Sequence, residues 1–141
     1  MRDLTRAHTV RATPRDDRGS VSLEIAILGP ALLLLVFSVV QVSLWFCARS
    51  LALAAAQEGV NAARTYSADP GSGVTRARAF INEQAGDSLT QTTVTSAGSS
   101  PTLIRIQVTG RSLSVLPGVP GIEVTQSAAG PIERFTTGVG P

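Results

Sequence analysis

The sequence predicts an α+β protein: a long N-terminal helix, transmembrane and then extended outside the membrane, packs against a small C-terminal antiparallel sheet. Residues 25–48 contain no charged side chain, and about 20 apolar residues suffice to cross a hydrocarbon core of ~30 Å. Residues 104–109 alternate apolar and polar side chains, which is the period of a half-buried strand. The 141 residues leave room for one small domain beyond the helix.

The first 19 residues are predicted to form a basic cytoplasmic leader without fixed structure. Arginine counts beside a membrane span set its orientation. After the span, Arg49 is followed by no basic residue until Arg64. We therefore expect a single-pass protein of the cell membrane with its N-terminus in the cytoplasm and its C-terminus outside. The leader's arginines are Arg2, Arg6, Arg11, Arg15 and Arg18.

Residues 20–68 are predicted to form the transmembrane helix and its extracytoplasmic extension. Gly29 and Pro30 interrupt the apolar run, and proline removes one main-chain hydrogen bond, so we expect a helix break there, either a plain kink or a hinge. Small residues beyond the span recur at spacings of three and four, which places them on one helical face suited to close packing. Either the chain's own sheet or another subunit would cover this face. It consists of Ala48, Ala52, Ala55, Gly59 and Ala62.

Residues 69–141 are predicted to form the small extracytoplasmic α+β domain. The run from Asp69 to Gly73 is rich in proline and glycine, which should end the first helix. A short second helix is expected over residues 74–85, followed by three strands. The strands are expected at residues 91–96, 104–109 and 122–128.

Composition excludes several kinds of chemistry. Cys47 is the single cysteine and His8 the single histidine, so an internal disulfide and the usual zinc sites are excluded. The net charge of +2 is too small to indicate nucleic-acid binding. The acidic residues outside the span show no spacing typical of an active site. We expect no enzyme activity, no catalytic residues, no cofactor or metal, and no small-molecule substrate.

Glu24 stands where the polar leader meets the apolar run. A carboxylate on the first turn of a membrane helix is costly unless it lies among the headgroups or has a partner. The helix N-terminus favours an anion in the first case. The second case requires a positive group brought by another molecule. Both interpretations fit the residue pattern.

The residues from Arg18 to Glu24, RGSVSLE, resemble the processing site of a type IV prepilin. This resemblance implies that a membrane peptidase cuts between Gly19 and Ser20. Ser20 would then become the new N-terminus, and Glu24 would pair with the α-ammonium group of a neighbouring subunit. The apolar run after Glu24, the alanine-rich AAAQEGVNAARTY and the closing SVLPGVPGIEVTQSAAGPIERF are similar to the TadE-like family of pseudopilins.

TadE-like proteins are minor components of tight-adherence (Flp-type) pilus systems. The resemblance implies a pseudopilin or minor pilin that acts in pilus assembly and hence in cell adhesion. Its implied partners are a prepilin peptidase, the Tad-type platform proteins with their secretion ATPase, and other pilins, besides membrane lipid. The alternative is a signal-anchored envelope protein whose extracytoplasmic domain binds a partner without entering a filament.

Overall fold

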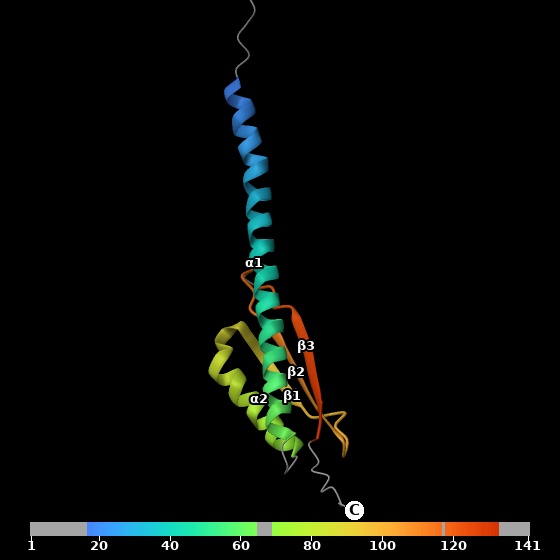
Figure 1. The fold of residues 1–141 in the computed structure, drawn as a ribbon. Coiled ribbons are helices and arrows are strands. Elements are labelled where there is room, and N and C mark those ends of the chain that lie inside the picture. Colours follow the sequence, from blue (N-terminus) through green and yellow to red (C-terminus); the bar gives the residue numbers. More distant parts are fainter. Residues whose placement is uncertain (1–16, 65–68, 117, 133–141) are drawn as a thin grey trace, which may run out of the picture. The chain divides into compact units, whose positions relative to one another are not determined.

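The computed structural model describes residues 17–64, 69–116 and 118–132, with the side chains of residues 17–20 left aside. It divides into two compact units, residues 1–35 and 36–141, each of which is described by itself. The predicted α+β class is confirmed. The elements are α1 (Asp17–Ala63), α2 (Pro70–Gln84), the 3-10 turn η1 (Gly86–Ser88), β1 (Leu89–Thr95), β2 (Leu103–Ser112) and β3 (Glu123–Pro131) (Figure 1).

Helix α1 runs from Asp17 to Ala63, close to the range that the sequence predicts. Alanine and leucine dominate its sequence, and both are strong helix formers. The expected continuation over residues 65–68 lies outside the described residues, as does most of the predicted unstructured leader. The first unit holds only the beginning of α1 among the residues described.

The start of α2 differs from the prediction, which placed it at residue 74. Asp69 is the N-cap, and its carboxylate accepts hydrogen bonds from the main-chain N–H groups of Gly71 (2.9 Å) and Ser72 (3.0 Å). Pro70 occupies the first helical position, where a missing N–H costs nothing. The segment interpreted as a helix breaker therefore initiates the second helix. An Asp–Pro pair is a helix start signal in its own right.

The three strands form one antiparallel sheet in the order β1–β2–β3. All three overlap the predicted strand ranges, and β2 and β3 pair without interruption from Leu103↔Pro131 to Arg111↔Glu123. The β1–β2 register shifts between Thr90 and Thr93, and Gln91 lies inside this bulge with a φ of 50°. A bulge bends one strand and increases its twist.

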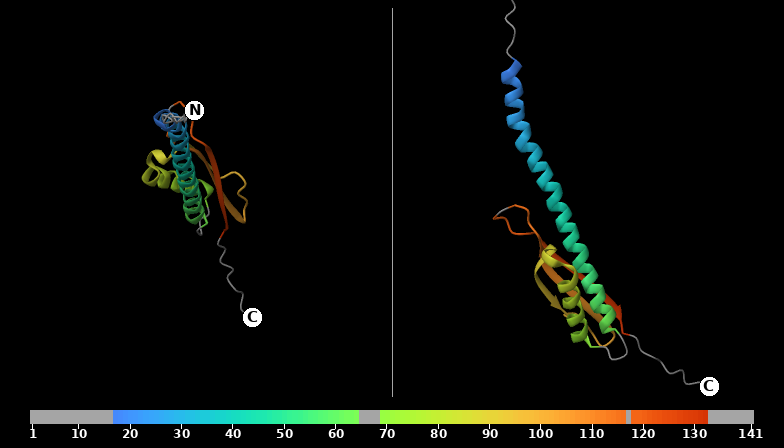
Figure 2. Two further views of the ribbon diagram at one scale, coloured as in Figure 1. Left: turned by 90° about the horizontal axis from the view of Figure 1, so that it is seen from above. Right: turned by 90° about the vertical axis from the view of Figure 1, so that its left-hand side faces the viewer.

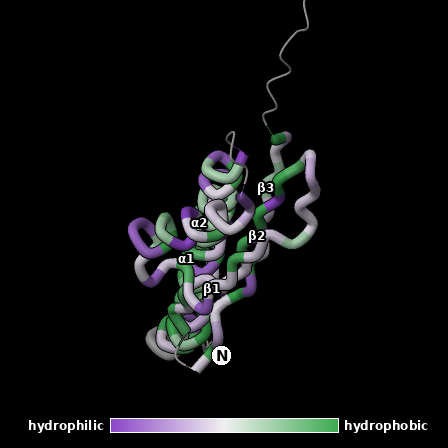
Figure 3. Tube along the Cα trace, turned by 90° about the horizontal axis from the view of Figure 1, so that it is seen from below, coloured by the Kyte–Doolittle hydropathy of each residue, from purple (hydrophilic) through white to green (hydrophobic). Residues whose placement is uncertain are grey.

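One face of the sheet is buried and the other is polar. On β2, Ile104, Ile106 and Val108 are at most 1% exposed, whereas the neighbours between them point to the other face. This confirms the predicted alternation. The opposite face is lined by residues such as Thr109 and Thr125, whose hydroxyl groups lie 3.3 Å apart. Along α2, purple and green alternate in Figure 3, as expected of a helix with one buried face.

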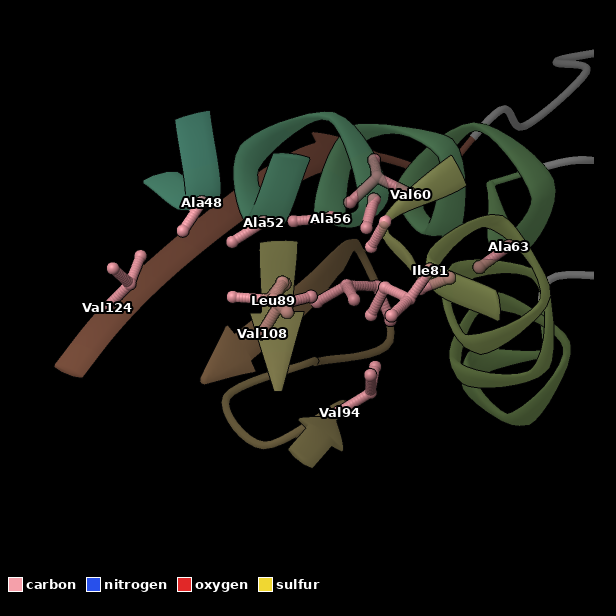
Figure 4. Close-up of a cluster of buried hydrophobic side chains, with 14 of the residues drawn as sticks. Ala48, Ala52, Ala56, Val60, Ala63, Ile81, Leu89, Val94, Val108 and Val124 are labelled. Carbon is pink, nitrogen blue, oxygen red and sulfur yellow. The ribbon is translucent and has the colours of Figure 1, made fainter. Parts of the chain in front are cut away.

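The core of the second unit lies between this sheet face, α2 and the C-terminal part of α1 (Figure 4). Both helices cover the same face, because glycines from each of them lie against Ile106. Alanines dominate the α1 contribution. Small side chains allow the helix backbone to approach the sheet closely. The buried apolar residues of α1 are Ala48, Ala52, Ala55, Ala56, Val60 and Ala63.

Candidate functional site

The first half of α1 exposes an unbroken series of large apolar side chains. Leu34 is 66% exposed and Leu23 is 65% exposed, and none of the most apolar window of α1 is buried. In the part of the chain that the structure describes, α1 is the one helix long and apolar enough to cross a membrane. A core helix of a soluble protein would bury such a surface. The exposure and composition of α1 therefore suggest a membrane anchor.

Glu24 lies on the exposed surface of this half of α1. A shallow groove along the same face is lined by Glu24, Leu28, Leu32 and Leu35. Among the described side chains, none forms an ion pair with Glu24. The carboxylate therefore lies at the helix surface, beside an apolar groove.

Gly19 and Ser20 lie inside the first turns of α1, which begins at Asp17. Gly29 and Pro30 lie inside the same helix, and the helix continues through both. A methyl group added at Gly29 would meet nothing within 4 Å. The surface around Gly29 is therefore open. The kink predicted for this position stays a prediction.

The small-residue face of α1 contacts the chain's own helix and sheet. A Cβ atom added to Gly59 would lie 2.7 Å from the main-chain oxygen of Gly73 in α2 and 3.2 Å from Ile106 Cγ2 in β2. A Cβ atom added to Gly73 would in turn lie 2.7 Å from the main-chain oxygen of Gly59. The two helix backbones therefore touch, which only glycine at both positions permits.

The residues of this face largely match those expected from their spacing. Ala48, Ala52 and Ala55 are fully buried, and Gly59 is buried where α1 contacts α2. Ala62 is only half-buried. The buried stripe is also wider than predicted, because Ala56, Val60 and Ala63 belong to it. A helix packed on a sheet buries neighbouring positions on both sides of its contact line, which spacings of three and four alone do not reveal.

Gln41 is a feature of α1 that the sequence analysis missed. Its Nε2 donates to the carbonyl oxygen of Leu113 (3.2 Å), and its Oε1 accepts from the N–H of Val115 (3.2 Å). The signal in the sequence is a glutamine within an otherwise apolar run, because an amide side chain in lipid requires hydrogen-bonding partners. The loop between β2 and β3 supplies them.

The ion pairs elsewhere in the described part of the chain lie on its surface. Arg76 of α2 lies 3.6 Å from Glu58 and 4.0 Å from Glu83, and all three side chains are exposed to solvent. Cys47 is a free, exposed thiol. Within the described residues, no group of three or more His, Cys, Asp or Glu side chains could hold a metal ion.

A protein-family model matches the N-terminal part of the chain. Residues 19–61 match the model of the family described as TadE-like protein. This segment is TadE-like. No curated protein and no solved structure matches the chain.

The TadE-like segment contains the Gly19–Glu24 junction, the exposed apolar helix and most of the small-residue face. It ends before α2 and the sheet begin. The match and the apolar helix together fit a membrane-anchored protein associated with Tad pili. The small domain to which this helix is attached is described by the structure alone.

Proposed function

We propose that this protein is a pseudopilin of a tight-adherence pilus system, which assists assembly or enters the filament as a minor pilin. The exposed apolar half of α1 within the TadE-like segment carries this proposal. A helix with apolar residues on every side is suited to two successive environments, the bilayer and a bundle of similar helices. The small domain formed by residues 69–141 would then be carried outside the membrane.

The orientation follows from the arginines before the span. Five arginines precede Gly19, whereas Arg49 is the single basic residue close to the other end. Basic residues are retained on the cytoplasmic side. The leader is therefore placed in the cytoplasm, where a prepilin peptidase with a site on that face would reach the Gly19–Ser20 bond. Glycine in the first turns of α1 weakens the helix locally and eases the opening that cleavage requires.

Glu24 is given the role of subunit pairing. Cleavage after Gly19 would leave an α-ammonium group on Ser20, and the exposed Glu24 of a neighbouring subunit would bind it. Attraction between unit charges rises as the effective dielectric constant falls, so this pair is much stronger between packed helices than in water. Because each charge is costly to bury alone, the pair would fix the axial position of one helix relative to the next.

The proposed partners follow from these steps of insertion, cleavage and subunit pairing. A prepilin peptidase trims the leader, Tad-type platform proteins and a secretion ATPase move the helix out of the bilayer, and other pilins receive it. The apolar surface of α1 is the contact in the last two steps. Neither step requires a catalytic residue in this chain.

The central experiment replaces Glu24 with glutamine. The variant should insert into the membrane at native levels, because a neutral side chain is cheaper to insert, and the number of pili per cell should fall. Glu123→Gln, at the start of β3, is the matched control and should leave pilus number unchanged. Native pilus numbers in the Glu24→Gln strain would contradict the pairing role.

A second experiment concerns the leader. Gly19→Leu should block trimming, and mass spectrometry of the native protein should find Ser20 as its first residue. An intact leader in cells with an active peptidase would refute processing. If, in addition, no pilin copurified with the protein, the signal-anchored envelope protein would replace the pseudopilin as the better explanation.

A further inference from the structure

The loop between β2 and β3 is apolar and carries no charge. No charged residue occurs from Ser112 to Ile122. Outside α1, every exposed large apolar side chain that the structure describes lies in this loop. They are Leu113 (41% exposed), Leu116 (38%), Val119 (51%) and Ile122 (47%).

The described backbone of this loop, residues 113–116 and 118–122, is tied by hydrogen bonds although four of its side chains are exposed. At its base, the N–H of Ser112 donates to the carbonyl of Ile122 (2.9 Å), and the N–H of Ile122 donates to the Ser112 hydroxyl (3.1 Å). Near its tip, the N–H of Val119 donates to the carbonyl of Leu116 (3.2 Å). Figure 2 shows the loop reaching beyond the end of the sheet. Four exposed apolar side chains on hydrogen-bonded backbone to either side of Pro117 indicate a contact surface.

Gln41 places this loop at the level of the membrane boundary. Counted from Ile25, about 20 residues of helix cross the hydrocarbon core and end near Leu44. Gln41 lies three residues earlier, about 4.5 Å inside that end. Trp45 follows, with the Arg49 guanidinium 5.7 Å from its ring centre, a pair suited to the headgroup region. The loop bonded to Gln41 is therefore at the same depth.

The hydrogen bonds of Gln41 lower the cost of placing a loop there. Irregular backbone at membrane depth is tolerated only where its polar groups have partners. The side chain of Gln41 satisfies one carbonyl, that of Leu113, and one N–H, that of Val115. Because the loop has no charged side chain, its insertion does not remove water from a charged group. These features fit lipid better than another protein, because another protein would itself supply hydrogen-bonding groups to the loop.

We propose that the β2–β3 loop inserts its apolar side chains into the bilayer surface beside the end of the α1 span. The occupant of this surface is lipid at the boundary between headgroups and acyl chains. The domain then has two attachments to the bilayer, the helix and the loop. Two attachments restrict how the protein can tilt in the bilayer, which a single helix would leave free. The proposal requires the membrane anchor and does not depend on assembly into a pilus.

Fluorescence quenching of the full-length protein in lipid vesicles tests this proposal. Cys47→Ser removes the native thiol, and Leu116→Cys or Val119→Cys accepts the environment-sensitive probe NBD. Thr93→Cys, on the exposed polar face of β1, is the matched control. The protein is kept dilute relative to lipid so that copies rarely meet.

Both loop probes should show blue-shifted emission and lose intensity when the vesicles contain brominated acyl chains. Iodide in the water should quench the Thr93→Cys probe and spare the loop probes. Loop probes that respond to iodide as the control does would overturn the proposal, because the loop would then lie in water. Shielding from both quenchers would also overturn it, because it would show a protein contact.

Gln41→Leu separates the role of the loop from that of its attachment. The variant keeps α1 apolar and removes both hydrogen bonds to the loop. The Leu116→Cys probe should then become more accessible to iodide and less quenched by brominated lipid. An unchanged quenching pattern would overturn the role assigned to Gln41 in holding the loop at the bilayer.

Discussion

The contact between the backbones of α1 and α2 can be tested by adding one methyl group at Gly59. The new Cβ would lie 2.7 Å from the main-chain oxygen of Gly73, inside van der Waals contact, and 3.2 Å from Ile106 Cγ2. The helices would have to separate by several tenths of an ångström. Neither neighbour can yield easily, since one is backbone and the other is a fully buried side chain at the centre of the core.

Two opposing terms decide the size of the effect. Alanine in place of glycine within a helix stabilises it by about 1 kcal/mol. Overpacking a well-filled core costs about 1–3 kcal/mol. Because the clash involves main-chain atoms, we expect the upper part of that range and a net loss of about 1–2 kcal/mol for Gly59→Ala. In Gly29→Ala, the added methyl group meets nothing, so no loss is expected.

Urea unfolding of the full chain in detergent micelles measures this difference. Trp45 is the single tryptophan and packs against the core, so its fluorescence reports on the second unit. With a slope of about 2 kcal/mol per molar urea, the midpoint for Gly59→Ala should fall by roughly 0.5–1 M. A midpoint equal to or above the native one would refute the close packing of α1 on its own domain. It would favour instead a face reserved for another subunit.

Three further substitutions, two of them with a control variant, test other parts of the second unit by the same urea titration. Asp69→Ala removes the N-cap of α2 and should cost about 1 kcal/mol, whereas Asp69→Asn should retain most of the stability; equal losses would contradict the capping role. Ile106→Ala, at a position with 0% exposure, should cost about 2–5 kcal/mol. Gln107→Ala, its neighbour on the polar face, should cost under about 0.5 kcal/mol, and similar losses for the two would contradict the assignment of the sheet faces. Arg76→Ala breaks only exposed ion pairs and should cost less than about 1 kcal/mol, with the difference shrinking in high salt; a larger, salt-independent loss would show that Arg76 has a packing role.

Local patterns were sufficient for much of the fold. The alternation of Ile104, Ile106 and Val108 with polar neighbours predicts both the strand and its buried face, because side chains of a strand alternate strictly. The uncharged run after Glu24 predicts a helix suited to lipid, because few other structures satisfy the backbone there. The Gly19–Glu24 junction, together with the apolar and alanine-rich run after it, predicts the TadE-like family, and the match over residues 19–61 confirms this for that segment. The start of α2 was missed because Pro70 and Gly71 were interpreted as breakers without considering Asp69 as a cap.

The sequence by itself determined where the chain leaves water, which residues form helices and strands, and which side of each element is apolar. These properties depend on neighbours within a few positions, so a period or a run of residues reveals them. Only the tertiary structure decided what covers each apolar side: Gly59 meets Gly73 and Ile106, and Gln41 holds a loop more than 70 positions away. Such contacts join segments that are distant along the chain, and many partners of similar size and polarity would satisfy the same local pattern.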